Sequence, residues 1–297
     1  MSRPISARRA VLEVLGAATL FGTTGTTASF APATASSVAI GAARLVIGGV
    51  GLTLALPLLG GSRAQVARLV RTPVGFVAAV STALYQLTFF AAVARTGVAI
   101  GTLVAIGSGP VLAGLISWAL LGERPTAVWW TSTGICIAGL ALLGADGIGN
   151  ADGDLAGIAL ALCAGASFAA YTVSAKRLMV RGAAPAESMA TAFGGGALLL
   201  LPVLAVAGVA WLGAPRGAGI ALWLGLATVS FAYVLFGRGL RVLPAGPVAT
   251  LVLAEPLVAT ILGVLVLGEP LGASSWLGAA LVGLGLALEA IVASLRD

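Results

Sequence analysis

The chain has 297 residues, of which 59% are apolar and only 9% are charged, and its mean hydropathy is +1.09. Soluble domains carry about 25% charged residues, so this composition excludes an ordinary soluble protein. Only helices and closed barrels satisfy the backbone in lipid, and apolar runs of roughly 20 residues favour helices over the ~10-residue alternation of barrel strands. We therefore expect an all-α integral membrane protein.

Apolar runs between charged residues and Pro/Gly breaks predict ten transmembrane helices. They are expected at residues 10–30, 37–59, 74–94, 98–121, 127–145, 155–176, 185–210, 218–239, 245–267 and 273–293. Two arginines before the first run and the tripeptide Ala33–Ala35 after it imitate a secretory signal. However, Phe21 in the first span matches Phe168 in the sixth, so we expect the first span to belong to an internal repeat.

The repeat is clearest where residues 95–142 align with residues 241–288 without a gap. A membrane protein built from two such halves has the plan of a secondary transporter, with substrate held between the halves near the bilayer midplane. We expect a first repeat at 1–147 and a second at 148–297. The coinciding positions are Arg95/Arg241, Pro110/Pro256, Gly122/Gly268, Glu123/Glu269, Trp130/Trp276 and Gly139/Gly285.

The basic residues predict how the chain is oriented. With a cytoplasmic N-terminus, 13 of the 16 Lys and Arg residues fall in cytoplasmic segments, and only Arg95 and Arg216 lie outside. This bias satisfies the positive-inside rule, while the acidic link Asp146–Asp154 lies outside. Both termini are then cytoplasmic, and five spans in each half place Glu123 inside and Glu269 outside. The two five-helix repeats are therefore expected to be inverted.

In both halves a mid-helix proline is followed by an apolar stretch and a Leu-Gly-Glu ending, at 110–123 and at 256–269. With Arg44 and the aromatic third span (Tyr85, Phe89 and Phe90), this pattern resembles the EamA-type transporters of the drug/metabolite transporter superfamily over nearly the whole chain. Within that family the likeness is greatest to bacterial amino-acid exporters. The resemblance implies ten helices, a central cavity formed by helices 1, 3, 4, 6, 8 and 9, and export of small metabolites.

The two prolines are candidate hinges. A proline in a helix interior removes one backbone hydrogen bond and leaves a carbonyl one turn earlier unsatisfied. Pro110 and Pro256 occupy equivalent repeat positions, so we expect the fourth and ninth helices to bend where the halves meet, although prolines are common in membrane helices generally.

Polar and aromatic residues within the apolar spans are candidates for the cavity lining. Each Ser or Thr has an alternative role, because its hydroxyl often bonds to the carbonyl four residues earlier. Tyr85 and Tyr171 are stronger candidates, since a mid-helix phenol needs a buried partner. The full set is Thr23, Thr24, Thr26, Thr27, Tyr85, Gln86, Phe89, Ser108, Ser167, Tyr171, Thr172, Ser230 and Tyr233.

Two ionisable residues lie deep in the predicted spans. Glu255 directly precedes Pro256 about ten residues into the ninth span, where a carboxyl group is costly unless it is neutral, paired or facing water. Its repeat partner is Gly109, so the halves differ here, and Glu255 is either a substrate or proton site or a neutral structural carboxyl. Arg44 begins the second span, where its side chain can reach the interface, so anchoring or ion pairing explains it more simply than substrate contact.

Enzymatic function is not expected. The chain has no histidine, no phosphate-binding glycine loop and no clustered carboxylates within the spans, so neither metal nor cofactor is predicted. Cys136 and Cys163 fall in apolar spans, where they serve as small packing residues. The net charge of +6 needs no nucleic-acid partner, because the basic residues set orientation and bind anionic lipid. An ion channel is a rival, but no filter or charged ring supports it.

These observations predict a monomeric bacterial inner-membrane transporter that exports or exchanges small metabolites by alternating access. Amino acids with apolar or aromatic side chains are the expected substrates, bound by apolar and aromatic walls, hydroxyls and helix ends. Lipophilic cationic drugs, which would depend on Glu255, and another metabolite class remain alternatives.

Overall fold

The computed structural model describes residues 6–145 and 154–295, which form helices and contain no strand. Eight helical segments in these residues are long and apolar enough to cross a membrane, which confirms the all-α membrane class. They are Ser37–Leu59, Pro73–Leu121, Ala127–Ala145, Leu155–Val180, Pro185–Ala207, Pro215–Val242, Ala245–Leu267 and Ala273–Ser294.

The difference from the ten predicted spans has two causes. Helix α1, Ala7–Ser29, corresponds to the first predicted span and is 23 residues long, but its threonines and Glu13 make it too polar to count among the eight. The third and fourth predicted spans both lie in the 49-residue element α4, Pro73–Leu121, which consists of two helices that meet at a kink at Gly97. Instead of the expected loop, α4 contains a single non-helical residue, Gly97, whose φ of 78° and ψ of 164° are accessible only to glycine.

The remaining elements follow the predicted spans closely, with short helices added between them. The structure contains α2 (Ser37–Ala55), η1 (Leu56–Leu59), α3 (Arg63–Leu69), α5 (Ala127–Ala145), α6 (Leu155–Val180), α7 (Pro185–Ala207), η2 (Ala210–Gly213), α8 (Pro215–Leu222), the π-helical η3 (Trp223–Phe231), α9 (Ala232–Val242), α10 (Ala245–Leu251), α11 (Ala254–Leu267) and α12 (Ala273–Ser294).

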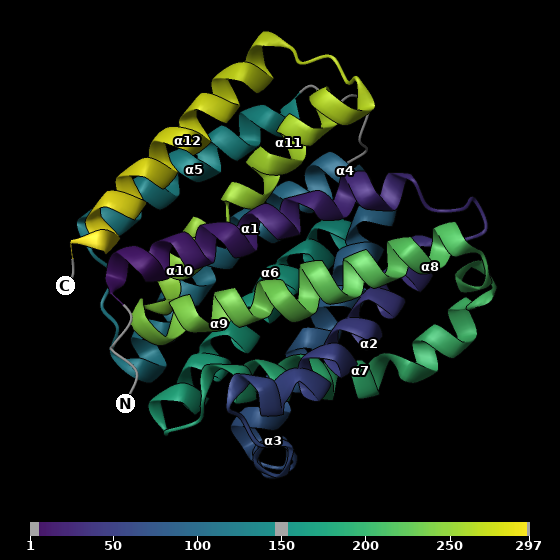
Figure 1. Cartoon of the computed structure of the whole chain (residues 1–297). Helices are drawn as coiled ribbons and strands as arrows, with labels where there is room; N and C mark the ends of the chain where they lie inside the picture. Colours follow the sequence, from purple (N-terminus) through teal and green to yellow (C-terminus); the bar gives the residue numbers. More distant parts are fainter. Residues whose placement is uncertain (1–5, 146–153, 296–297) are drawn as a thin grey trace.

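Helices α5 and α12 lie side by side at one edge of the bundle (Figure 1). A Cβ atom on Gly139 would lie 2.7 Å from the carbonyl oxygen of Gly278, and one on Gly285 would lie 2.8 Å from that of Ser132. The two contacts are equivalent under the 146-residue repeat, because Gly139 corresponds to Gly285 and Ser132 corresponds to Gly278. Both contacts can form together only if the two helices run antiparallel. The interface is thus self-complementary, as a two-fold axis demands.

The interface between α5 and α12 also contains a buried carboxyl group. Glu289 in α12 is only 2% exposed and accepts a hydrogen bond from the Ser132 hydroxyl in α5. A buried carboxyl group is tolerated where a hydroxyl donates a hydrogen bond to it.

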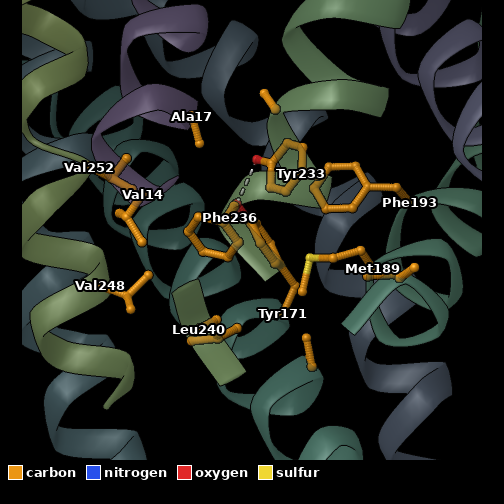
Figure 2. Packing of buried hydrophobic residues seen from close by; sticks show 14 of the residues in the cluster. Val14, Ala17, Tyr171, Met189, Phe193, Tyr233, Phe236, Leu240, Val248 and Val252 are labelled. Carbon is orange, nitrogen blue, oxygen red and sulfur yellow. Dashed lines mark hydrogen bonds between the residues drawn. The ribbon is translucent and has the colours of Figure 1, made fainter. Parts of the chain in front are cut away.

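The core lies where α1, α6, α7, α9 and α10 meet. Figure 2 shows Tyr171, Phe193 and Phe236 gathered beside Met189 and Val248. Tyr171 and Phe236 are almost completely buried, so the aromatic rings fix the spacing of these helices.

The start of α1 and the end of α12 lie at the same end of the bundle (Figure 1). At the start of α6, Asp154 caps the helix and forms an ion pair with Arg95, with Nε and Oδ2 2.7 Å apart. The Arg95 guanidinium, with help from backbone N–H groups, holds the pKa of Asp154 below its usual value. Asp146 and Asp152, also placed in this link, lie outside the described residues.

Candidate functional site

A cavity lies in the middle of the helix bundle. It holds about 520 Å³ of empty space, including space continuous with solvent. Its lining comes from both predicted repeats and consists of Phe21, Arg44, Leu45, Thr82, Tyr85, Gln86, Phe168, Tyr171, Phe193, Val229, Tyr233, Val252 and Glu255.

Aromatic rings form much of the wall. The hydroxyls of Tyr171 and Tyr233 are hydrogen-bonded at 2.9 Å, drawn as the dashed line in Figure 2. The rings of Phe193 and Tyr233 have centroids 3.7 Å apart, and Tyr85 meets Tyr171 edge-on at 6.4 Å. Phe21 approaches Tyr233 from α1, with centroids 4.9 Å apart. Such a wall offers flat apolar surface with a few phenolic oxygens.

Two charged side chains of opposite sign share the cavity. Arg44 projects from α2, and its Nε donates a hydrogen bond to the Thr228 hydroxyl in η3 at 3.0 Å. Glu255 lies in the first turn of α11, where the helix dipole favours a negative charge. We expected Arg44 to act as a membrane anchor or as an ion-pair partner, but its side chain lines the cavity. Within the described residues, Arg44 forms no ion pair.

Five of the predicted lining residues meet in this cavity, namely Tyr85, Gln86, Tyr171, Tyr233 and Glu255. The other nine lie outside the lining. Some of their hydroxyls bond to nearby groups: Thr23 donates to a carbonyl one turn earlier in α1, Ser108 does the same in α4, and Ser230 donates to the Gly48 carbonyl. The remaining six are Thr24, Thr26, Thr27, Ser167, Thr172 and Phe89, which stacks on Tyr85.

The lining also contains residues that were not predicted. Phe21 and Phe168 occupy equivalent positions in the two repeats, and this coincidence was a usable signal in the sequence. Thr82, Phe193, Val229 and Val252 carried no comparable signal, because they resemble ordinary packing residues. Residues 98–121 of α4 contribute nothing to the lining, whereas the second and seventh predicted spans do, which corrects the expected set of helices.

The two prolines have different surroundings. Pro110 lies buried in the part of α4 that follows the kink at Gly97, and the helix has no break at Pro110 itself. The ninth span is interrupted between Leu251 and Ala254, just before Pro256. This interruption places Glu255 at a helix start beside the cavity.

One end of the bundle is closed where α10 packs against the end of α4. The position of a Cβ atom on Gly246 lies 3.2 Å from the Cα atom of Gly114. Glu123 accepts hydrogen bonds from the Ser117 hydroxyl at 2.5 Å and from the Ala245 N–H at 2.9 Å. Lys176 adds a nitrogen 3.7 Å from the same carboxylate. By contrast, α11 packs mainly against α1.

The sequence profile of the EamA-like transporter family matches the chain twice, at residues 8–145 and at residues 155–290. The chain belongs to this family. It is therefore a membrane transporter of small molecules.

Among its relatives is the uncharacterized transporter YwfM of Bacillus subtilis (strain 168), which is 46% identical over 275 residues that cover 93% of this chain and 91% of the relative. The putative permease-like protein YdzE of the same organism is 34% identical over 67 residues, 23% of this chain and 86% of that protein. A solved structure described as "Crystal structure of protein" shares the fold, with a TM-score of 0.80 and 22% identity over 97% of this chain and 99% of that one.

Proposed function

We propose that this EamA-family protein is an alternating-access carrier of small organic solutes in a bacterial inner membrane. The observation that carries the proposal is a cavity lined by both halves of the chain, with α10 packed closely against α4 at one end of the bundle. A carrier needs such a site between two moving halves, whereas a channel needs a continuous path.

Ten crossings follow if α1 is added to the eight apolar segments and α4 is counted as two at Gly97. The antiparallel, self-complementary contact of α5 with α12 supports two inverted five-helix repeats, 1–147 and 148–297. Both termini are cytoplasmic in this proposal, so the end sealed by Glu123 is the cytoplasmic one and the cavity opens outward. A monomer suffices, since one chain supplies the whole lining.

Amino acids with apolar or aromatic side chains are the proposed substrates, either exported or exchanged. The rings of Phe21, Tyr85 and Phe193 offer the wall that such a side chain needs, and Gln86 adds amide groups. A carrier of lipophilic cations is the second candidate, because Glu255 is an acidic group beside the same rings.

Uptake by proteoliposomes tests the proposal. The purified protein is assayed with a panel of amino acids, nucleosides and lipophilic cations, with and without unlabelled solute inside. Saturable uptake of apolar or aromatic amino acids, accelerated by solute on the far side, is expected. Saturable uptake of lipophilic cations alone would favour the second candidate, and no saturable uptake of any solute would contradict a carrier.

A further inference from the structure

Arg44 and Glu255 are opposite charges that face one cavity from the two halves of the chain. Both are partly exposed there, and no ion pair recorded for the described residues joins them, so their nearest N and O atoms are more than 4.0 Å apart. Charges deep in a membrane protein are costly unless they pair or face water. Two opposite charges held apart leave space for a ligand that carries both charges itself.

We propose that Arg44 binds the carboxylate and Glu255 the ammonium group of a zwitterionic amino acid, and that this pair determines specificity. The inference rests on the proposed carrier function. The Thr228 hydroxyl accepts from Nε of Arg44, which leaves the two terminal NH₂ groups for a bidentate carboxylate. Glu255 has no recorded side-chain partner in the described chain, so its carboxylate is available to an ammonium group.

The aromatic wall completes the site. With both charged ends of an amino acid held between α2 and α11, its side chain is left to the rings around Tyr171 and Tyr233. Because Arg44 belongs to the first half and Glu255 to the second, a bound zwitterion links the halves through its own charges. An amine without a carboxylate leaves Arg44 unpaired, and an acid without an ammonium leaves Glu255 unpaired, so both bind more weakly.

Two series of ligands with constant side chains test this assignment. Binding to the purified protein is measured for phenylalanine, phenethylamine and 3-phenylpropionate, and for leucine, 3-methylbutylamine and 4-methylpentanoate. In the wild type, one amino acid binds at least ~10-fold more tightly than its amine or its acid. Arg44→Gln abolishes the preference over the amine, and Glu255→Gln abolishes the preference over the acid.

The controls separate this inference from the carrier function. Arg68→Gln removes an exposed arginine on α3 and leaves all preferences unchanged. Arg44→Lys keeps a cation and retains the preference over the amine, which covers the case in which Arg44→Gln fails to fold. Equal weakening of all three ligands in either variant overturns the assignment, as does a wild type that binds the amine as tightly as the amino acid. A wild type that takes up no solute rejects the carrier function instead.

A second inference comes from the Leu-Gly-Glu endings, which the cavity does not use. Glu123 closes one end of the bundle by accepting the N–H of Ala245 at the start of α10. The repeat equivalents of these two residues are Glu269 and Ala99, which follows the break at Gly97. Glu269 instead lies just after α11 and against Gly263 of that helix, where a Cβ atom would be 2.5 Å from Oε2. No side-chain hydrogen bond is recorded for Glu269 in the described chain.

We propose that the two glutamates close opposite ends in turn, with Glu269 accepting the Ala99 N–H when the Glu123 contact opens. In an inverted repeat, exchanging the conformations of the halves converts one open state into the other, so a contact made by Glu123 implies the same contact for Glu269. This step also rests on the carrier function. Each carboxylate then stabilises only the state in which its own end is sealed.

Accessibility of a cysteine in the cavity tests the exchange. Phe168→Cys is placed in a chain carrying Cys136→Ala and Cys163→Ala, and its reaction with an impermeant maleimide is timed from each side of oriented vesicles. Glu123→Ala increases labelling from the cytoplasmic side about tenfold relative to the other, and Glu269→Ala shifts the ratio the opposite way, as loss of one charge-assisted hydrogen bond predicts.

Arg124→Ala, beside Glu123 but exposed and without a recorded contact in the described residues, leaves the labelling ratio unchanged. Shifts in the same direction for both glutamate variants, or no shift for either, would overturn the exchange. Labelling of the Phe168→Cys chain without either glutamate change tests the carrier function by itself. If the site alternates, the probe reaches this cysteine from both sides of the membrane.

Discussion

The hydroxyl oxygens of Tyr171 and Tyr233 lie 2.9 Å apart and join α6 to α9 at the cavity wall. Both side chains are buried, with exposed fractions of 1% and 7%. A buried hydroxyl that loses its partner costs about 1–3 kcal/mol. The pair therefore links the packing of two helices to the shape of the site.

Tyr233→Phe is expected to lower the stability of the protein by about 1–3 kcal/mol, because the Tyr171 hydroxyl loses its partner. Tyr171→Phe should have a similar effect. The double variant removes both hydroxyls and should be more stable than the sum of the single changes predicts. Thermal unfolding in detergent measures these differences, and strictly additive effects would show that the two hydroxyls do not depend on each other.

Gly139→Ala is expected to destabilise the contact of α5 with α12 by about 1–3 kcal/mol, since overpacking forces the backbones apart. The added Cβ atom would lie 2.7 Å from the Gly278 carbonyl oxygen, and backbone atoms cannot move aside as a side chain can. Gly278→Ala should behave alike. Gly134→Ala and Gly283→Ala, on the same helices but with open space at the Cβ position, are the matched controls and should retain stability. Equal melting temperatures for all four variants would contradict close packing at Gly139.

The sequence predicts the positions of the helices well, but it predicts poorly which helices pack against one another. Apolar runs and glycine or proline breaks are local signals, so most of the spans were correctly placed. The break predicted between the third and fourth spans lies at Gly97, where a single residue with positive φ makes a kink in place of a loop. The position of Arg44 depends on Thr228, 184 residues further along the chain, and no periodicity shows that α2 and η3 are adjacent. Tyr85, Tyr171 and Glu255 were predictable because each is costly to bury without a partner.

Pro256→Ala is expected to slow turnover several-fold, while Pro110→Ala should have a smaller effect. Proline at 256 supplies no N–H to the Val252 carbonyl, which accepts the Glu255 N–H instead at 2.8 Å. Alanine would restore the missing donor and let α10 and α11 join into one helix, which removes the break beside the cavity. Initial rates and affinities in proteoliposomes, with protein insertion measured alongside, separate a slower cycle from weaker binding. Equal loss of turnover in both variants would mean that the interruption before Pro256 has no special role.

The orientation argued from the basic residues predicts that the start of α6 faces the periplasm. Leu155, which follows the Asp154 cap, is 81% exposed, so a cysteine there should react with a probe that cannot cross the membrane. In a chain without its two native cysteines, Leu155→Cys should be labelled while the inner membrane is intact, provided that the probe can reach the outer face of that membrane. Arg68→Cys on α3, among the arginines expected in the cytoplasm, should react only after the inner membrane is permeabilised. The reverse pattern would place the Glu123 contact on the outside, so the cavity would open toward the cytoplasm and the direction assigned to each glutamate would be exchanged.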